Sequence, residues 1–189
     1  HTWENSKNEQ SHQDPTIGEA LLGEMSDTAR VLFPVDENTA CAALRAVYAS
    51  RGQVACVVVS KRDTPNHFSA AAAQSLIEHG AAHVAGDPST AQLQFVAIGA
   101  YQLEEALKAH ARLEHHGLAS CITVVVEPGR LRIPRDELEA AFVLGDESLQ
   151  AHPGRQEHLP HRAHAGAQPA DPPDVRALRL PRAAAAARS

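Results

Sequence analysis

In three stretches of the chain, apolar residues mostly follow one another rather than alternate with polar ones, and this pattern predicts buried β-strands. They cover residues 29–35, 53–60 and 119–126. Continuous apolar runs of this length are typical of parallel sheets that helices cover on both faces. The stretch 53–60 (QVACVVVS) is β-branched and apolar on both faces, so we expect it in the middle of its sheet. Two weaker apolar stretches predict a strand at 93–98 and an edge strand at 82–85.

Between these strands, apolar residues recur at helical spacing. The pattern predicts helices over residues 17–25, 38–50, 69–79, 102–115 and 134–142. Asp36 is expected to cap the second helix, and Gly80 to end the third. The buried face of the second helix is expected to hold Ala40, Ala43, Leu44 and Val47. Strands and helices in alternation predict an α/β fold with parallel or mostly parallel sheets and helices on both faces.

A turn cluster, Gly86-Asp87-Pro88-Ser89, separates two α/β units. We therefore expect a domain boundary there, with one domain ending near residue 85 and the next covering 90–145. Beyond it, residues 151–189 are rich in Ala, Pro, Arg and His and lack Lys, Ile, Phe, Tyr and Trp. Such a composition predicts a disordered tail. The alternative is a shifted reading frame in a GC-rich gene, which the DNA across codons 145–160 would decide.

Charge and cysteine content narrow the class of protein. The 189 residues carry a formal net charge of −6, which disfavours a nucleic-acid partner. The three cysteines, Cys41, Cys56 and Cys121, lie in apolar runs and suit buried thiols in a reducing, cytoplasmic setting. No apolar run is long enough to span a membrane and no signal peptide is recognisable. Residue 1 is His rather than Met, so we expect the chain to be a piece of a longer protein.

Three histidines in and directly after the fourth expected helix, His110, His115 and His116, are candidate metal ligands. No thiol or carboxylate is spaced to complete a cage around them. We therefore expect partly solvated helix histidines and no metal ligands.

Two polar features are candidates for chemistry. Residues 7–15 (KNEQSHQDP) gather an amide, an imidazole, a hydroxyl and an ammonium group directly before a helix. A helix N-terminus favours anions, because its free N–H groups and its dipole both attract negative charge. Lys61 follows a predicted central strand, where α/β sheets bind ligands. The alternatives are a solvated N-terminal tail and a solvated lysine.

These features together resemble the phosphoketolase family. The resemblance rests on three segments in order: N-x-x-S-H-Q-D-P at 8–15, V-x-F-P-V-D-x-N at 31–38, and the β-branched strand that ends before Lys61. It covers roughly residues 1–145. By this resemblance, residues 1–85 are the end of the domain that faces the pyrimidine of thiamine diphosphate. Residues 90–145 are the start of a transketolase-like C-terminal domain.

The resemblance implies an activity and its cofactors. Phosphoketolases are aldehyde-lyases that use thiamine diphosphate and Mg²⁺ to cleave xylulose 5-phosphate or fructose 6-phosphate with inorganic phosphate. The products are acetyl phosphate and an aldose phosphate. The resemblance further implies a homodimer, and it leaves the diphosphate and Mg²⁺ to parts of the enzyme that this chain lacks. The chain alone is thus expected to be inactive.

Matching positions carry the family's roles onto this chain. His12 would lie near the reacting centre and assist proton transfer, because an imidazole titrates near neutral pH. Asn8 and Lys61 would bind the phosphate of the sugar. Gln13 and Asp14 would support the loop.

Lys7 departs from the family, whose well-known members have His there. A lysine still attracts phosphate, but the change leaves the preferred sugar phosphate open. Two other functions remain as alternatives. One is a non-catalytic α/β subunit that docks on a cofactor-bearing partner. The other is a different thiamine enzyme such as transketolase.

Overall fold

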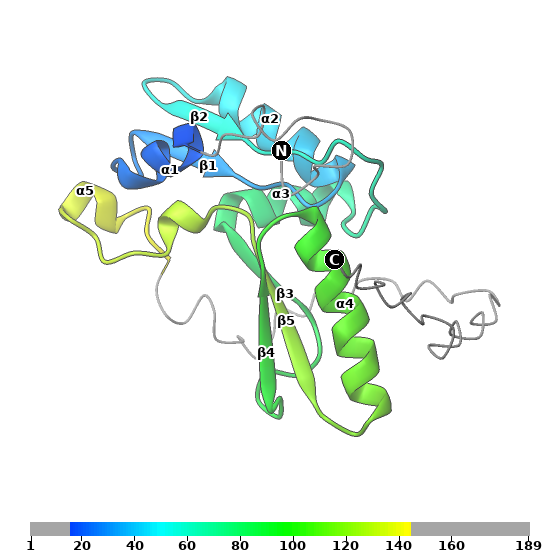
Figure 1. Cartoon of the computed structure of the whole chain (residues 1–189). Coiled ribbons are helices and arrows are strands. Elements are labelled where there is room, and N and C mark those ends of the chain that lie inside the picture. The colour runs from blue at the N-terminus through cyan, green and yellow to red at the C-terminus, as the bar shows by residue number, and fades with distance from the viewer. Residues whose placement is uncertain (1–15, 145–189) are drawn as a thin grey trace, which may run out of the picture.

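Helices and strands alternate along the chain in a computed structural model, which describes residues 16–144 (Figure 1). Their order is α1 (Thr16–Gly23), β1 (Ala29–Leu32), α2 (Glu37–Ala49), β2 (Val54–Val57), α3 (Ala70–His79), β3 (Ala81–Ala85), β4 (Leu93–Ala97), α4 (Ala100–His115), β5 (Ser120–Val125), the 3-10 turn η2 (Pro128–Arg130) and α5 (Glu137–Ala140). Each predicted strand and helix is present, although α5 is a single turn.

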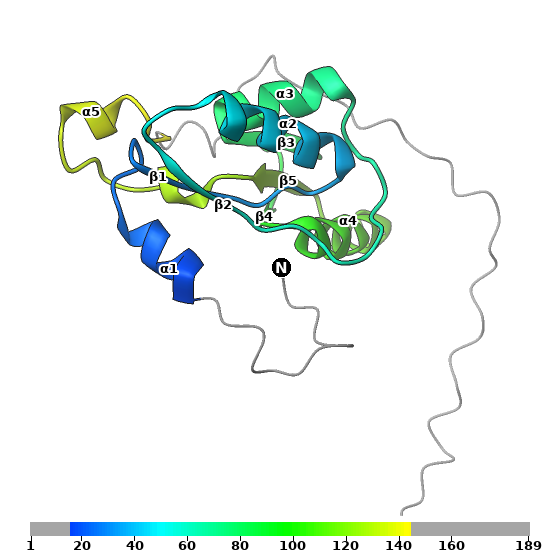
Figure 2. The same ribbon diagram turned by 90° about the horizontal axis from the view of Figure 1, so that it is seen from above.

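The strands form two small sheets. β1 and β2 pair in parallel, and β5 lies between β3 and β4 in a second sheet. β4 runs parallel to β5, whereas the edge strand β3 runs antiparallel to it. The prediction of an α/β fold with mostly parallel sheets is therefore confirmed. Figure 2 shows α2 and α3 on one side of the strands and α4 on the other.

The most buried strand is β5 rather than β2. All six residues of β5 are buried, which suits its central place. β2 pairs only with β1 among residues 16–144, and Val54 is 56% exposed. The prediction that residues 53–60 lie in the middle of a sheet is therefore wrong for the described part of the chain. An apolar run shows that a strand can be covered, but pairing of its second edge depends on other segments.

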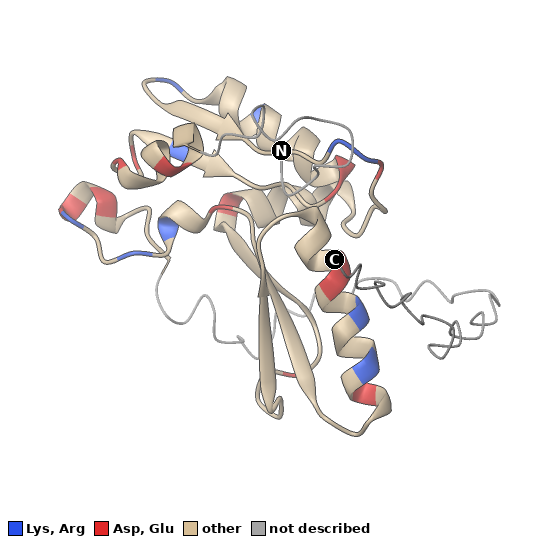
Figure 3. Cartoon of the chain, viewed as in Figure 1, with Lys and Arg blue, Asp and Glu red and all other residues tan. Residues whose placement is uncertain are grey.

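One hydrophobic core joins both sheets and three helices. Its buried members come from β1, α2, α3, β3, β4, α4 and β5, and the largest of them are Leu32, Val35, Phe68, Leu76, Ile77, Val84, Leu103, Ile122, Val124 and Val126. The strands β3, β4 and β5 carry no Asp, Glu, Lys or Arg, and Figure 3 shows the charged residues on the surrounding helices and loops.

Local capping signals are confirmed in detail. Asp36 caps α2, and its side chain forms a capping box with Thr39. Gly80 ends α3 with a φ of 77°, a left-handed conformation that glycine adopts without strain. The buried face of α2 differs from the prediction, because Thr39, Ala42 and Ala43 are buried whereas Leu44 is 44% exposed.

The turn at 86–88 lies between β3 and β4, which belong to the same sheet. Gly86 has a φ of 75°, and a Cβ atom there would lie 2.0 Å from the carbonyl oxygen of Ser120 on β5. The turn therefore packs tightly against the central strand. The division into domains at this turn stays a prediction. The tail 151–189 lies outside the described residues.

Candidate functional site

The carboxyl ends of β1 and β2 lie at the same edge of their sheet, because the two strands are parallel. Asp36 lies four residues beyond the end of β1, and Lys61 lies four residues beyond the end of β2. Open α/β sheets bind their ligands at such an edge. This edge is therefore the candidate site that the described residues present.

The Asp36 carboxylate joins two segments at this edge. Its Oδ1 accepts hydrogen bonds from the backbone N–H and the hydroxyl of Thr39, at 2.8 Å and 2.7 Å. Its Oδ2 accepts from the backbone N–H groups of His67 and Phe68, both at 2.8 Å. The residue is only 4% exposed. A buried carboxylate is stable when its oxygens are hydrogen-bonded in this way.

Two further contacts hold the segment that follows β2. The side-chain amide of Asn38 donates to the carbonyl oxygen of Phe68 at 2.7 Å. The imidazole Nε2 of His67 lies against a carboxylate oxygen of Glu104 on α4. This segment, residues 58–69, thus contacts both the N-terminal end of α2 and the first turns of α4.

The beginning of the same segment is held as well. The N–H of Val58 donates to the carbonyl oxygen of Leu32 at 2.8 Å. The guanidinium carbon of Arg62 lies 5.9 Å from the centre of the Tyr101 ring, a cation–π distance. Lys61 is exposed between these two contacts. An exposed lysine on a held segment can present its charge to an anion at a defined place.

Of the predicted site residues, the structure places Lys61 alone. His12, Asn8, Lys7, Gln13 and Asp14 lie outside the described residues. The expectation that Lys61 follows the end of β2 is confirmed, since it lies on the segment after that strand. Its role as a phosphate ligand stays a prediction.

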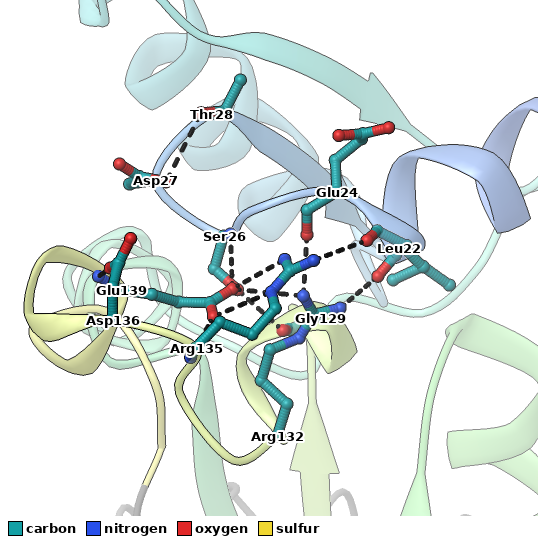
Figure 4. Close-up of polar contacts among 11 residues, drawn as sticks. Leu22, Glu24, Ser26, Asp27, Thr28, Gly129, Arg132, Arg135, Asp136 and Glu139 are labelled. Atoms are coloured by element: carbon teal, nitrogen blue, oxygen red, sulfur yellow. Dashed lines mark hydrogen bonds and ion pairs between the residues drawn. The ribbon is translucent and has the colours of Figure 1, made fainter.

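A buried polar cluster holds η2 and α5 against the end of α1 (Figure 4). The fully buried Glu139 accepts hydrogen bonds from the backbone N–H of Ser26 at 3.0 Å and of Arg135 at 2.8 Å. It also forms ion pairs with Arg132 at 3.1 Å and with Arg135 at 3.0 Å. These donors stabilise the charged form and hold the pKa of Glu139 well below its ordinary value of 4.5, with Arg135 the largest cause.

The same two arginines donate hydrogen bonds to backbone carbonyl groups at the C-terminal end of α1. Arg132 donates to the carbonyl oxygens of Leu22 and Glu24, and Arg135 donates to that of Gly23 at 3.0 Å. The last carbonyl groups of a helix lack partners within the helix, and cations are favourable at this end. Residues 132–139 thus fix the helix that directly follows the predicted site residues.

A second buried ion pair links β1 to the residue before η2. Arg30 binds Glu127 through two parallel hydrogen bonds of 2.7 Å, and the Glu127 side chain is 3% exposed. Hydrogen bonding to Glu127 raises the pKa of Arg30. Arg130 lies 3.8 Å from the same carboxylate, and burial lowers its pKa. Within residues 16–144, these contacts attach β1 to the segment that follows β5.

The histidines and cysteines are dispersed. His110 pairs with the Ser120 hydroxyl at 2.8 Å, and the rings of His115 and His116 lie 5.5 Å apart, edge to face. The expectation that all three cysteines are buried is wrong for Cys41, which is exposed because it lies on the outer face of α2. Cys121 is buried, and burial raises the pKa of its thiol.

Sequence reasoning missed the groups that organise this edge. Asp36 was expected only as a helix cap, and His67 and Glu104 were not singled out. The spacing Arg135-Asp136-x-x-Glu139 is a helical ion-pair signal, but it is typical of solvated helix faces too. Contacts between residues about thirty positions apart leave no mark in the periodicity of a chain.

Within residues 16–144, no group of three or more His, Cys, Asp or Glu side chains is arranged to hold a metal ion. Among the same residues, no helix is long and apolar enough to cross a membrane.

Solved structures show the same fold. The chain aligns with transketolase from Pichia stipitis in complex with sedoheptulose-7-phosphate at a TM-score of 0.53 and 18% identity, over 71% of this chain and 18% of that one. It aligns with transketolase from Leishmania mexicana at a TM-score of 0.52 and 21% identity, over the same shares of 71% and 18%. At such identities the likeness shows the fold alone.

Sequence comparisons are more specific. The family model described as D-xylulose 5-phosphate/D-fructose 6-phosphate phosphoketolase matches residues 1–50. A probable phosphoketolase from Lactococcus lactis is 30% identical over 151 residues, and one from Streptomyces avermitilis is 31% identical over 142 residues. These alignments cover 76% and 72% of this chain. The chain belongs to the phosphoketolase family and spans about 18% of the length of the curated relatives that it matches.

Proposed function

We propose that this chain is part of a phosphoketolase that cleaves xylulose 5-phosphate, fructose 6-phosphate or both with inorganic phosphate. The observation that carries the proposal is the family match over residues 1–50, the stretch that holds S-H-Q-D-P. The place of Lys61 beyond the carboxyl end of β2 supports it, since that edge is where α/β sheets receive ligands.

The overall reaction converts a ketose phosphate and inorganic phosphate into acetyl phosphate, an aldose phosphate and water. Thiamine diphosphate with Mg²⁺, when bound, supplies the carbanion chemistry that breaks the carbon–carbon bond. By the family resemblance, parts of the enzyme beyond this chain would hold this group. The protein groups of this chain supply substrate binding, orientation and proton transfer.

Lys61 binds the phosphate group of the sugar in this proposal. Its ammonium is a point charge that donates to phosphate oxygens, and Asn8 adds a neutral donor. Lys7 adds a second positive charge near Asn8 in the sequence. Such contacts are equal in the bound substrate and the transition state, so they act on KM more than on kcat.

His12 is proposed as the group that moves protons at the reacting carbon atoms. An imidazole can both take and give a proton near neutral pH, which suits a reaction that loses water. Gln13 and Asp14 support the loop that carries His12.

Acetyl phosphate formation tests the proposal. The polypeptide that contains this chain is incubated with xylulose 5-phosphate and inorganic phosphate in the presence of thiamine diphosphate and Mg²⁺. We expect acetyl phosphate, and none when phosphate is omitted. Transfer of two carbon atoms to an added aldose phosphate, without acetyl phosphate, would identify a transketolase activity instead.

A second candidate remains from the sequence, a non-catalytic role in a complex. A non-catalytic α/β subunit would dock on a separate polypeptide that carries the cofactor. It would co-purify with that polypeptide and form no acetyl phosphate alone. We further propose a cytoplasmic homodimer and the domain division at residues 86–88, for which hydrogen exchange across this turn is the direct measurement.

A further inference from the structure

We propose that Asp36 is a positioning residue, whose carboxylate holds the segment 58–69 and so fixes where Lys61 stands at the sheet edge. The structural part of this inference stands on its own. Only the consequence for substrate binding rests on the proposed function.

The two oxygens of the Asp36 carboxylate have separate tasks. Oδ1 accepts both bonds from Thr39, and these complete the cap of α2. Oδ2 takes no part in the cap. It accepts two bonds of 2.8 Å from the N–H groups of His67 and Phe68, more than thirty residues further along the chain. A helix cap needs a single acceptor. The second oxygen is therefore free to bind the segment that carries Lys61.

Another helix of the same chain shows a cap without this second task. Asp136 caps α5 through the same bond, from Oδ1 to the backbone N–H of Glu139 at 2.8 Å. Its capping bond is to its own helix. A comparison of variants at Asp36 and Asp136 can therefore distinguish the effect of losing a helix cap from the effect of losing the bonds to residues 67 and 68.

Two further contacts lie between the anchored ends of the segment: the guanidinium carbon of Arg62 lies 5.9 Å from the centre of the Tyr101 ring, and the backbone N–H of Glu37 donates to Oδ1 of Asn66 at 3.1 Å. The Ser60 hydroxyl bonds to the backbone carbonyl oxygen and N–H of Arg62, which orders a local turn. Five of the six residues from Lys61 to Asn66 are exposed, so apolar burial does not hold them. The two bonds that Asp36 accepts at residues 67 and 68 attach the backbone of this segment on the C-terminal side of Lys61.

The substitution Asp36→Asn removes the second task selectively. Asparagine is as good a cap as aspartate, since its Oδ1 accepts from Thr39. Its NH₂ group then faces the two N–H donors of His67 and Phe68, and donors do not bond to donors. The cap is retained while the segment loses its anchor.

Limited trypsin digestion of the full 189-residue chain reads out the segment directly. Lys61 and Arg62 are exposed trypsin sites, and Arg51 in the turn before β2 is an exposed reference site. We expect Asp36→Asn to speed cleavage after residues 61 and 62 about tenfold, which corresponds to about 1.4 kcal/mol of local stability. Cleavage after Arg51 should not change, and the matched control Asp136→Asn should cleave at the parent rate at all three sites.

Equal rates at 61 and 62 in the parent and Asp36→Asn would overturn the inference. The same holds for an equal acceleration at Arg51, which would show general loosening. If Asp36→Asn fails to fold, Asn38→Ala decides. It removes the bond to the Phe68 carbonyl and leaves the capping box intact. Faster cleavage at 61 and 62 alone supports the positioning role, and unchanged cleavage contradicts it.

KM values of variants of the phosphoketolase that contains this chain distinguish a failure of the positioning role of Asp36 from a failure of the proposed function of Lys61. Asp36→Asn should raise KM for xylulose 5-phosphate in the parent, and should add nothing in a Lys61→Ala background, because the two act through one contact. Additional loss in that background would overturn the positioning role. An unchanged KM in Lys61→Ala alone would refute the proposed function of Lys61 and leave the digestion result standing.

Discussion

The ion pair between Arg30 and Glu127 offers the sharpest test of how the first sheet is attached to the second. The pair joins β1 to the chain just after β5, and two hydrogen bonds of 2.7 Å connect the side chains. Replacing Arg30 by Met keeps a long apolar stem and removes the charge. Glu127 then remains as a carboxylate that is 3% exposed.

The magnitude follows from the burial of the orphaned charge. Removing one partner of a buried ion pair costs about 3–5 kcal/mol, because the other charge loses its compensation. Two features reduce this cost here. Arg130 remains 3.8 Å from the Glu127 carboxylate, and the Arg30 side chain is itself 17% exposed. We therefore expect Arg30→Met to lower the free energy of unfolding by about 2–3 kcal/mol.

Urea unfolding of the 189-residue chain, followed by circular dichroism at pH 7, measures this loss. With a slope of about 1.5–2 kcal/mol/M, the midpoint should fall by about 1–2 M while the slope stays constant. The matched control is Lys108→Met, which breaks an ion pair with Glu105 between side chains that are 59% and 74% exposed. This control should leave the midpoint unchanged, because exposed pairs contribute little.

The double variant with Glu127→Gln tests the reason for the effect. If the cost arises from an unpaired buried charge, removing that charge should restore part of the stability that Arg30→Met loses. A double variant that is less stable than Arg30→Met would refute the reasoning. So would a midpoint for Arg30→Met that matches the parent protein.

Four further outcomes are expected. In the full-length enzyme, Lys61→Ala should raise KM for the sugar phosphate well before it lowers kcat, because its contact is uniform binding, and steady-state kinetics measure this. His12→Ala should lower mainly kcat, and near-normal turnover would assign the residue to structure. The pKa of Glu139 is lowered in the folded chain, so its contribution to stability is present above the ordinary value of 4.5 and is lost as the pH falls through the folded pKa. In Glu139→Gln, the free energy of unfolding from urea titrations should therefore fall less between pH 7 and pH 3 than in the parent protein. Gly86→Ala should destabilise the chain by about 1–3 kcal/mol in thermal unfolding, because the new Cβ would lie 2.0 Å from a backbone oxygen at a φ of 75°, whereas Gly18→Ala, with nothing within 4 Å, serves as its control.

The polar clusters explain why the edge of the first sheet is well defined although β1 and β2 are short. Glu139 holds the end of α1, Glu127 holds β1, and Asp36 holds the segment after β2. Each carboxylate accepts at least two hydrogen bonds from residues far away in the sequence. Buried networks of this kind favour one arrangement, because partial breakage leaves charges without partners.

Local signals in the sequence determined the elements and their ends. Apolar runs located β1 and β5, helical spacing located α3 and α4, and the cap at Asp36 was recognisable from residue type and position. The family resemblance was likewise carried by a short motif and its spacing, and the comparisons confirmed it. These features depend on neighbours within a few residues, and the order of amino acids contains that information directly.

Only the tertiary structure decided which strand is central and what the charged residues do. The run 53–60 around β2 was expected to be the central strand, yet β5 is buried throughout because it alone has a strand on each side among residues 16–144. The second oxygen of Asp36 meets its donors only when β1 and β2 lie side by side. Pairing and ion-pair choice join residues that are distant in the chain, and periodicity within one segment contains no record of such partners.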